Sequence, residues 1–332
     1  MAGSVYLVGD IGGTHTRLAL VAPSGRTVRE QEFASQKVAS LEAALLQFLG
    51  AITPKPTIKG AALAIAGPVV NGRCVATNLP WVVDEHVIAR KTKIKRVRLL
   101  NDLVALALGA IKTPRSKLRP LNGSALPRKG AGNVAVIAAG TGLGEAMLLW
   151  DGKRFIPNAT EGGHADFSPG DDLEVDLLKF LRARFGHVSW ERILSGNGLG
   201  GLYDFFVQGQ GVHESPERAA AIATAPDRNA AISALGLTGE SRAAAQALDL
   251  FARLYGAEAG NLALKTMALG GVYVCGAIAA HAMPILARGA FEQAFRAKGR
   301  FARLMETIPV VVVLDDQVGL AGSRAVALGK VL

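Results

Sequence analysis

The stretch VYLVGDIGGTHTRLALV, from Val5 to Val21, decides the fold. A short apolar run, a turn with adjacent glycines and a second apolar run are typical of two strands joined by a tight turn. A dinucleotide-binding fold instead requires the spacing G-x-G-x-x-G and a helix after the glycines. Gly9, Gly12 and Gly13 do not fit that spacing, and an apolar strand pattern follows them. We therefore predict a strand–turn–strand hairpin.

A second stretch of the same kind occurs further along the chain. VAVIAAGTGLGEAMLLW, from Val134 to Trp150, is again an apolar run, a glycine-rich turn and an apolar run. Two such hairpins, each opening its own half of the chain, predict two related α/β lobes. A cleft between two α/β lobes is a suitable place for a nucleotide. Phosphate-loop enzymes are excluded because no G-K-[ST] sequence occurs.

Composition narrows the possible functions further. The chain has 332 residues and two cysteines, too few for a disulfide scaffold or a cysteine-rich zinc site. It contains no G-x-S-x-G, H-E-x-x-H or C-x-x-C sequence, so serine-hydrolase, zincin and redox chemistry have no support. No apolar stretch is long enough to cross a bilayer, and the first ten residues lack the features of an export signal. We therefore expect a cytoplasmic protein with no membrane partner.

The net charge of +10 would help to attract anionic substrates or nucleic acid. The densest basic run is RKTKIKRVR, from Arg90 to Arg98, which leads directly into the apolar pair Leu99 and Leu100. The run has no interleaved aromatic residue, and such runs most often face water. We interpret it as a solvated helix end followed by the start of a strand, and we expect no nucleic-acid partner.

Asn101 and Asp102 lie where an apolar strand pattern gives way to a helical one. Ligands of open α/β sheets bind at the carboxyl ends of strands, so a carboxylate placed there could accept a proton from a substrate hydroxyl. The alternative is that one of the two residues only caps the helix. The residues alone leave both interpretations open.

The segment ATEGGHADFSPGDD, residues 159–172, is polar and interrupted by glycines. Glu161 and His164 could converge on one small ligand or on a metal ion, although the spacing is not that of a helical zinc motif. A lone histidine in a loop is, alternatively, a structural hydrogen-bonding group. Further on, Ser189 is expected to cap a helix over WERILSG, which would put Glu191 in its first turn, where the helix dipole favours a glutamate without any function.

These segments, taken in order, carry a family resemblance. VGDIGGTHTRLAL, GPV followed by TNLPW, LNDLVALALG, AAGTGLGEAML, EGGHADFSP, HVSWERILSGNGL, GGVYVCGAI and DDQVGLAGSRAVAL span nearly the whole chain. The chain resembles the bacterial ATP-dependent glucokinases, which belong to the superfamily of hexokinases, actin and the heat-shock chaperone ATPases. EGGH and SWERILSG are the specific segments, whereas the glycine hairpins occur across the superfamily.

The resemblance implies a two-lobed, ribonuclease-H-like α/β fold of the actin and hexokinase type, with a nucleotide cleft between the lobes. Residues 1–112 together with 314–332 would form the smaller lobe, and residues 113–313 the larger one. ATP, with Mg²⁺, would lie in the cleft, and glucose would be phosphorylated at its 6-hydroxyl as the entry step of glycolysis. The family often forms dimers, which implies a homodimer here.

The resemblance also implies roles for individual residues. Asp102 would be the general base for the 6-hydroxyl, and Asp10 would approach Mg²⁺, through water. The other sugar-binding residues would be Asn78, Asn101, Glu161, His164 and Glu191. The nucleotide-binding residues would be Gly9, Asp10, Ile11, Gly12, Gly13, Thr14, Gly140, Thr141, Gly142, Gly276, Ala277 and Ile278.

Two positions depart from the family pattern. His15 stands where Asn is common, and Ala277 where a second glycine is common. The first would alter the hydrogen bonds of the phosphate turn, and the second would tighten the space beside the nucleoside. Two alternative functions remain: a kinase of another hexose, and an actin-like or chaperone-like ATPase, which would need both hairpins but no sugar-binding cluster.

Overall fold

The structure is a computed structural model that describes residues 3–330 except 122, 124 and 129. Contacts among the residues divide the chain into two compact units. Unit 1 comprises the described residues up to Lys117, the segment Ala146–Ala159 and the described residues from Asp315 onward. Unit 2 comprises the described residues of Leu118–Glu145 and the segment Thr160–Leu314. Unit 1 is therefore assembled from segments that are far apart in the sequence.

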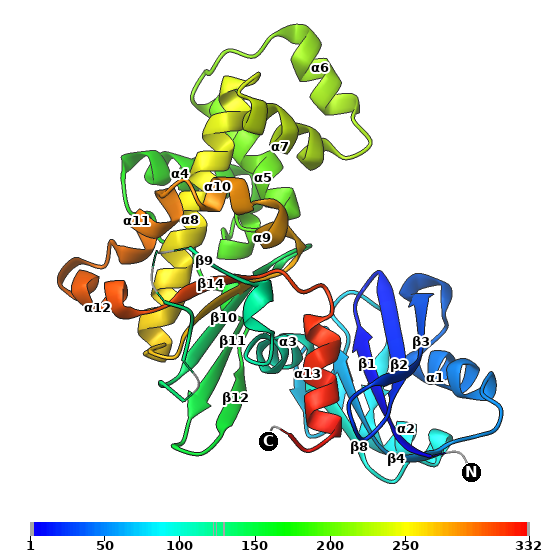
Figure 1. The fold of residues 1–332 in the computed structure, drawn as a ribbon. Helices are drawn as coiled ribbons and strands as arrows, with labels where there is room; N and C mark the ends of the chain where they lie inside the picture. Colours follow the sequence, from blue (N-terminus) through cyan, green and yellow to red (C-terminus); the bar gives the residue numbers. More distant parts are fainter. Residues whose placement is uncertain (1–2, 122, 124, 129, 331–332) are drawn as a thin grey trace. The chain divides into compact units, whose positions relative to one another are not determined.

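The five strands of the unit 1 sheet follow the order β3-β2-β1-β4-β8 (Figure 1). They are β1 (Ser4–Ile11), β2 (His15–Val21), β3 (Thr27–Ala34), β4 (Thr57–Ile65) and β8 (Val97–Asn101). β1 runs antiparallel to β2 and parallel to β4, and β4 runs parallel to β8. The predicted hairpin is confirmed, with residues 12–14 as its turn. A small antiparallel sheet contains β5 (Val69–Val70), β6 (Arg73–Val75) and β7 (Val82–Asp84).

Helices cover both faces of the unit 1 sheet. The alternation of strand side chains puts Leu7 and Ile11 on one face of β1 and Val8 on the other. The Leu7 face packs against α1 (Leu41–Gly50) and α2 (Glu85–Thr92), and the Val8 face against α13 (Val318–Ala327). The side chain of Ser40 accepts a hydrogen bond from the Ala43 N–H in the first turn of α1, as is typical of a serine at a helix N-cap.

The sheet that runs mainly through unit 2 has six strands in the order β12-β11-β10-β13-β14-β9. They are β9 (Leu118–Pro120), β10 (Val134–Ala139), β11 (Leu143–Trp150), β12 (Phe155–Ala159), β13 (Gly271–Cys275) and β14 (Val310–Val313). β10 is parallel to β13 and β13 to β14, whereas β11 is antiparallel to β12. The two sheets share one strand order, apart from β9. In each, a β-hairpin lies beside a central strand, β1 or β10, and two further parallel strands follow on the other side: β4 and β8 in one sheet, β13 and β14 in the other. This arrangement confirms the predicted α/β class.

The remaining helices belong to units 1 and 2 as follows. Unit 1 also contains α3 (Asp102–Ala110), directly after β8. Unit 2 contains α4 (Asp172–Phe185), α5 (Gly196–Asp204), α6 (Pro216–Thr224), α7 (Arg228–Thr238), α8 (Arg242–Thr266), α9 (Ala277–His281), α10 (Met283–Leu286), α11 (Ala290–Arg296) and α12 (Ala302–Thr307). Among the described helices, none combines the length and the hydropathy needed to span a bilayer.

α13 and α3 lie side by side in unit 1 and approach each other at glycines (Figure 1). A Cβ at Gly109 would overlap the carbonyl oxygen of Val318, and a Cβ at Gly322 would overlap that of Ala105. The two helix backbones are therefore in direct contact, which only glycine permits at these positions.

We predict that Gly109→Ala lowers the melting temperature of the unit 1 transition. The added methyl group must push two backbones apart, and overpacking of this kind costs about 1–3 kcal/mol, which corresponds to a fall of roughly 5 °C. Differential scanning calorimetry measures the change. Gly50→Ala is the matched control, because open space surrounds that helical glycine and alanine favours helix formation. Equal melting temperatures for the two variants would contradict the packing argument.

Candidate active site

The turn between β1 and β2 is held in place by hydrogen bonds from within unit 1. The Gly12 N–H donates to the His15 carbonyl oxygen at 2.9 Å, and the Ser35 hydroxyl donates to the Gly12 carbonyl oxygen at 2.8 Å. A Cβ at Gly13 would lie 2.8 Å from the Cβ of Asn78. The predicted phosphate turn and one predicted sugar-binding residue, Asn78, are thus neighbours. The contribution of Ser35 could not be found from a motif, because this residue lies in the 3₁₀ turn that follows β3, some twenty residues along the chain from the glycines.

His15, the first departure from the family pattern, bonds to the adjacent strand. Its Nδ1 lies 2.9 Å from the Oε1 of Glu32 on β3, and both side chains are exposed. An exposed pair of this kind contributes little to stability. The imidazole is therefore engaged at the surface of the sheet beside the turn.

Asp10 lies near the carboxyl end of β1, in a partly buried position. Burial raises the pKa of its carboxyl group, and the nearby Arg17 guanidinium lowers that pKa to a smaller extent. A Cβ at Gly319 of α13 would lie 2.8 Å from the Asp10 Oδ2, so the glycine leaves room for the carboxyl group. The charge of a desolvated carboxylate that only one neighbouring cation offsets can be compensated by a further positive charge.

Asn101 and Asp102 connect the carboxyl end of β8 to the amino terminus of α3. The Asn101 side chain is buried: its Oδ1 accepts from the Val104 N–H at 3.1 Å, and its Nδ2 donates to the Gly67 carbonyl oxygen at 3.1 Å. Asn101 is therefore the helix cap, and one amide hydrogen of its side chain is left for a ligand. Asp102 is half-buried, and its Oδ1 accepts from the Leu103 N–H at 2.9 Å.

In unit 2, the turn between β10 and β11 has its own set of supports. The Gly140 N–H donates to the Gly142 carbonyl oxygen at 2.8 Å, and the Gly196 N–H donates to the Gly140 carbonyl oxygen at 2.9 Å. The Leu143 N–H donates to the Oε2 of Glu191 at 3.0 Å. A Cβ at Gly142 would overlap that carboxylate oxygen. The second glycine turn and Glu191 are thus in direct contact.

The Glu-Gly-Gly-His segment packs on the same turn. Gly162–His164 forms one 3₁₀ turn, and the His164 Nε2 lies 3.8 Å from the Glu191 Oε2. A Cβ at Gly163 would overlap the Leu143 carbonyl oxygen, which explains why the residue is a glycine. Glu161 immediately precedes this turn and is exposed. The fold therefore brings together His164, Glu191 and the β10–β11 turn. Glu161 precedes His164 by three residues in the sequence.

The helix expected over WERILSG is wrong in its type and in its cap. Trp190–Arg192 is a single 3₁₀ turn, and Ser189 precedes it without a side-chain capping bond. Glu191 does lie in the first turn, but its carboxylate accepts the Leu143 N–H instead of stabilising a helix terminus. The competing interaction is the backbone of the glycine turn, which the local sequence does not reveal.

A buried pair of carboxyl groups lies beneath the Glu-Gly-Gly-His segment, and the sequence analysis missed it. Glu145 of β11 and Glu258 of α8 are 2% and 0% exposed, and their carboxyl groups are close enough to interact electrostatically. Burial, and to a smaller extent the neighbouring Glu258 carboxylate, raise the pKa of Glu145 to about 8. A Cβ at Gly162 would overlap the Glu145 Oε2. The segment thus rests directly on a carboxyl pair that retains a proton at neutral pH.

The nucleoside segment predicted at residues 276–278 borders a cavity of about 560 Å³ in unit 2. Gly276 has φ +92°, and a Cβ there would lie 2.5 Å from the Ala139 carbonyl oxygen, so only glycine fits. The side chains of Ala277 and Ile278 line the cavity. Its other lining residues include Ser195, Gly196, Asn229, Ser233 and Leu286, which no sequence motif indicated.

Comparison with known proteins gives the same family by three routes. The sequence profile of the glucokinase family matches residues 7–330. The glucokinase of Synechocystis sp. is 38% identical, with 98% of this chain and 98% of that protein covered. The glucokinase of an Antarctic psychrotroph superimposes with a TM-score of 0.80 at 30% identity over 98% of this chain and 99% of that chain. A ROK-family glucokinase from Streptomyces griseus, solved with glucose and AMPPNP, gives a TM-score of 0.65 at 21% identity over 97% and 98% of the two chains.

We predict that Glu145→Gln removes a pH dependence of stability. The pKa of Glu145 is about 8 in the folded protein, whereas a glutamate of the unfolded chain has its ordinary pKa of 4.5. The folded state therefore binds more protons in this window, and the free energy of unfolding falls as pH rises, by up to about 1.4 kcal/mol per pH unit. Denaturant unfolding between these pH values measures the slope. Glu306→Gln, at an exposed position, should retain it; an unchanged slope in Glu145→Gln would show that Glu145 is ionised in the folded protein.

Proposed function

The chain belongs to the glucokinase family, and on that premise we propose how its residues carry out ATP-dependent phosphorylation of glucose. The assignment to this enzyme activity rests on similarity along nearly the full chain. The position of Asp102 is the observation that supports the proposed mechanism most directly. It is the first residue of α3, at the carboxyl end of β8, where open α/β sheets bind ligands.

Asp102 accepts the proton of the glucose 6-hydroxyl as the hydroxyl oxygen bonds to the γ-phosphorus of ATP; the bond from that phosphorus to the bridging oxygen breaks, and ADP leaves. A sugar hydroxyl is a weak nucleophile, and a positioned carboxylate contributes about 10²–10⁴-fold to such a step. The hydrogen bond from the Leu103 N–H to Oδ1 orients the Asp102 carboxylate at the start of α3. Asn101 supports this geometry as the helix cap and offers its remaining amide hydrogen to the sugar.

Glu161, His164 and Glu191 bind the other hydroxyls of the same glucose molecule, and Asn78 adds a contact from unit 1. The pairing of His164 with Glu191 and the anchoring of Glu191 on the Leu143 N–H hold these groups in fixed directions. A polar site built for particular hydroxyls rejects analogues that lack one, because its own groups would remain unpaired. This cluster is the feature that an ATPase without sugar transfer would not need.

The two glycine turns hold the phosphates of ATP, and the cavity beside Ala277 and Ile278 holds its nucleoside. Backbone N–H groups can approach phosphate oxygens closely where no Cβ intervenes, as at Gly13, whereas the Gly12 and Gly140 N–H groups hold the shape of their own turns. The Ala277 methyl group narrows the cavity where the family commonly has glycine. The structure of the Streptomyces griseus enzyme with glucose and AMPPNP supports ATP and glucose as the two substrates.

Asp10 would hold Mg²⁺, through water. Among the described residues no group of three or more His, Cys, Asp or Glu side chains is arranged to bind a metal ion. Mg²⁺ bound with a nucleotide needs only one or two carboxylates, with phosphates and waters as its other ligands, so a single desolvated aspartate fits. When bound, the ion would neutralise phosphate charge.

We further propose that the functional lobes are residues 1–112 with 314–332 and residues 113–313. The two lobes close on glucose, which excludes water as a competing nucleophile. The enzyme would act in the cytoplasm as a homodimer, for which light scattering in solution is the direct check. Glucose is the proposed hexose; a coupled assay with a panel of hexoses, with and without Mg²⁺, tests that preference, and ADP release without any hexose would point to an ATPase instead.

Asp102→Asn should lower kcat by about 10²–10⁴-fold while the affinity for glucose stays close to normal. The amide retains an oxygen for the Leu103 N–H, so the local structure is kept while the base is lost. A coupled assay gives kcat, and calorimetry gives the glucose Kd. Asp176→Asn, on the exposed face of α4, is the control. Normal turnover of Asp102→Asn would remove Asp102 as the general base.

His164→Ala should raise the KM for glucose by at least about tenfold, because a sugar contact and the support of Glu191 are both lost. The Kd of ATP measured by calorimetry should not change. His187→Ala is the matched control, since His187 also pairs with a carboxylate, Asp166, on the surface of unit 2. A loss of ATP affinity with normal glucose affinity would assign this segment to the nucleotide.

A further inference from the structure

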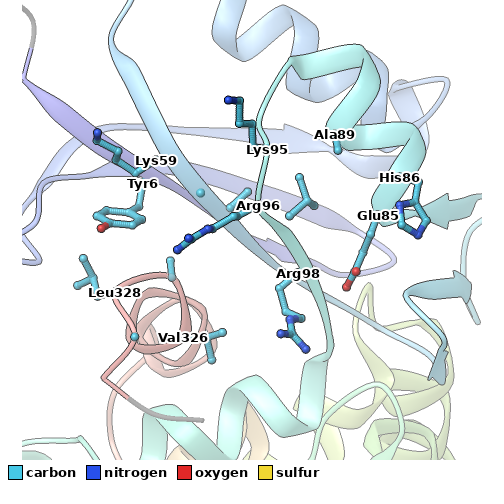
Figure 2. A pocket seen from close by; sticks show the side chains of 15 residues that line it. Tyr6, Lys59, Glu85, His86, Ala89, Lys95, Arg96, Arg98, Val326 and Leu328 are labelled. Atoms are coloured by element: carbon cyan, nitrogen blue, oxygen red, sulfur yellow. The ribbon is translucent and has the colours of Figure 1, made fainter.

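A second cavity, of about 1020 Å³, lies in unit 1 at the amino-terminal edge of the five-stranded sheet (Figure 2). Tyr6 of β1, Lys59 of β4 and Arg98 of β8 line it. Because these three strands are parallel, their carboxyl ends, which lead to Asp10 and Asp102, lie at the opposite edge. The cavity is therefore separate from the candidate active site.

Four cationic side chains line this cavity: Lys59, Lys95, Arg96 and Arg98. They come from β4, from the turn after α2 and from β8, so the fold, and not one basic run alone, brings them together (Figure 2). Arg98 alternates along β8 with Val97 and Leu99, which face α2, so it lies on the α13 side of the sheet with Leu100.

The positive charge of the described lining exceeds its negative charge, because four cationic side chains face the single carboxylate of Glu85. Within the described residues, none of the four cations forms an ion pair with a carboxylate. Glu85 is the acidic residue of the lining, and its Oε1 already accepts the Leu99 N–H at 2.6 Å. Like charges gathered around a concave surface focus a positive potential that attracts anions.

An apolar wall completes the cavity. The Tyr6 ring, Val326 and Leu328 lie beside Arg96 at the end of α13 (Figure 2). Guanidinium groups bind phosphate through paired hydrogen bonds, and an aromatic ring offers a face to an organic group. We propose that this cavity binds a small organic phosphate that carries at least two phosphate groups, with Arg96 and Arg98 on the phosphates and the organic part against Tyr6.

Two other functions of these four cations predict different binding results from those expected for a small organic phosphate. Arg96 and Arg98 could serve only to complement the negative end of the α13 dipole, which stabilises a helix C-terminus without any ligand. The basic run 90–98 could also bind the backbone of a nucleic acid. The concave shape and the adjoining apolar wall favour a small molecule over an extended polymer.

Calorimetric titration of the full-length protein tests the proposal. Glucose and a non-hydrolysable ATP analogue are added first at saturating concentration, so that the catalytic site is occupied. The probes are fructose 1,6-bisphosphate, inorganic pyrophosphate and a short single-stranded oligonucleotide. The Arg96→Gln/Arg98→Gln double variant is compared with Arg90→Gln/Lys93→Gln, which removes the same charge from the same run at residues outside the cavity lining.

We expect one bisphosphate per chain, bound more weakly as salt rises, and an affinity lower by at least about tenfold in Arg96→Gln/Arg98→Gln. The Arg90→Gln/Lys93→Gln control should bind like the wild type, and pyrophosphate should bind more weakly than the bisphosphate. Absence of bisphosphate binding to the wild type, or equal losses in both double variants, would overturn the proposal. So would a lower melting temperature of Arg96→Gln/Arg98→Gln with no probe bound by the wild type, or binding of the oligonucleotide alone.

Discussion

The approach of α13 to the sheet and to α3 is the constraint on which unit 1 depends. Residues from the two ends of the sequence meet here: the Ser323 hydroxyl donates to the Gly9 carbonyl oxygen at 2.9 Å, and Gly319 faces the Asp10 carboxyl group. Backbone contact of this kind requires glycine at Gly109 and Gly322. The first hairpin is therefore complete only when the last helix is in place, and the position of Asp10 follows from that packing.

In unit 2, too, glycines allow close packing, here around the Glu-Gly-Gly-His segment. Side chains are excluded at Gly142, Gly162 and Gly163 because a carboxylate or a carbonyl oxygen occupies the space beside each. The Glu-Gly-Gly-His segment can lie directly on the β10–β11 turn for that reason. The segment rests on the buried carboxyl pair Glu145 and Glu258, and the raised pKa of Glu145 keeps a proton on that pair at neutral pH. The glycines thus determine where the polar groups of the segment stand.

Local patterns in the sequence were sufficient to predict strands, helices and caps. They were insufficient to predict which distant residues contact one another. Both glycine hairpins, the Ser40 cap and the strand-to-helix change at Asn101 could be predicted, because each signal lies within a few residues. The Glu145–Glu258 pair could not be predicted, because the two residues are remote in sequence and neither lies in a recognisable motif of its strand or helix. Glu191 shows the same limit: its first-turn position was predicted, but the Leu143 N–H that it accepts comes from a distant turn.

Parallel strands give the two edges of the unit 1 sheet different chemistry. At the carboxyl edge, strands end in carboxylates and glycine turns, next to the amino terminus of α3, where backbone N–H groups point outward. At the amino edge, the cations of the second cavity gather near the C-terminal end of α13, whose dipole is negative. α13 spans the distance between these edges, with Gly319 beside Asp10 and Val326 in the cavity wall. A ligand that displaced the end of this helix would act on a rigid element whose other end supports the phosphate turn, because neither Gly109 nor Gly322 leaves space for the helix to move closer to α3.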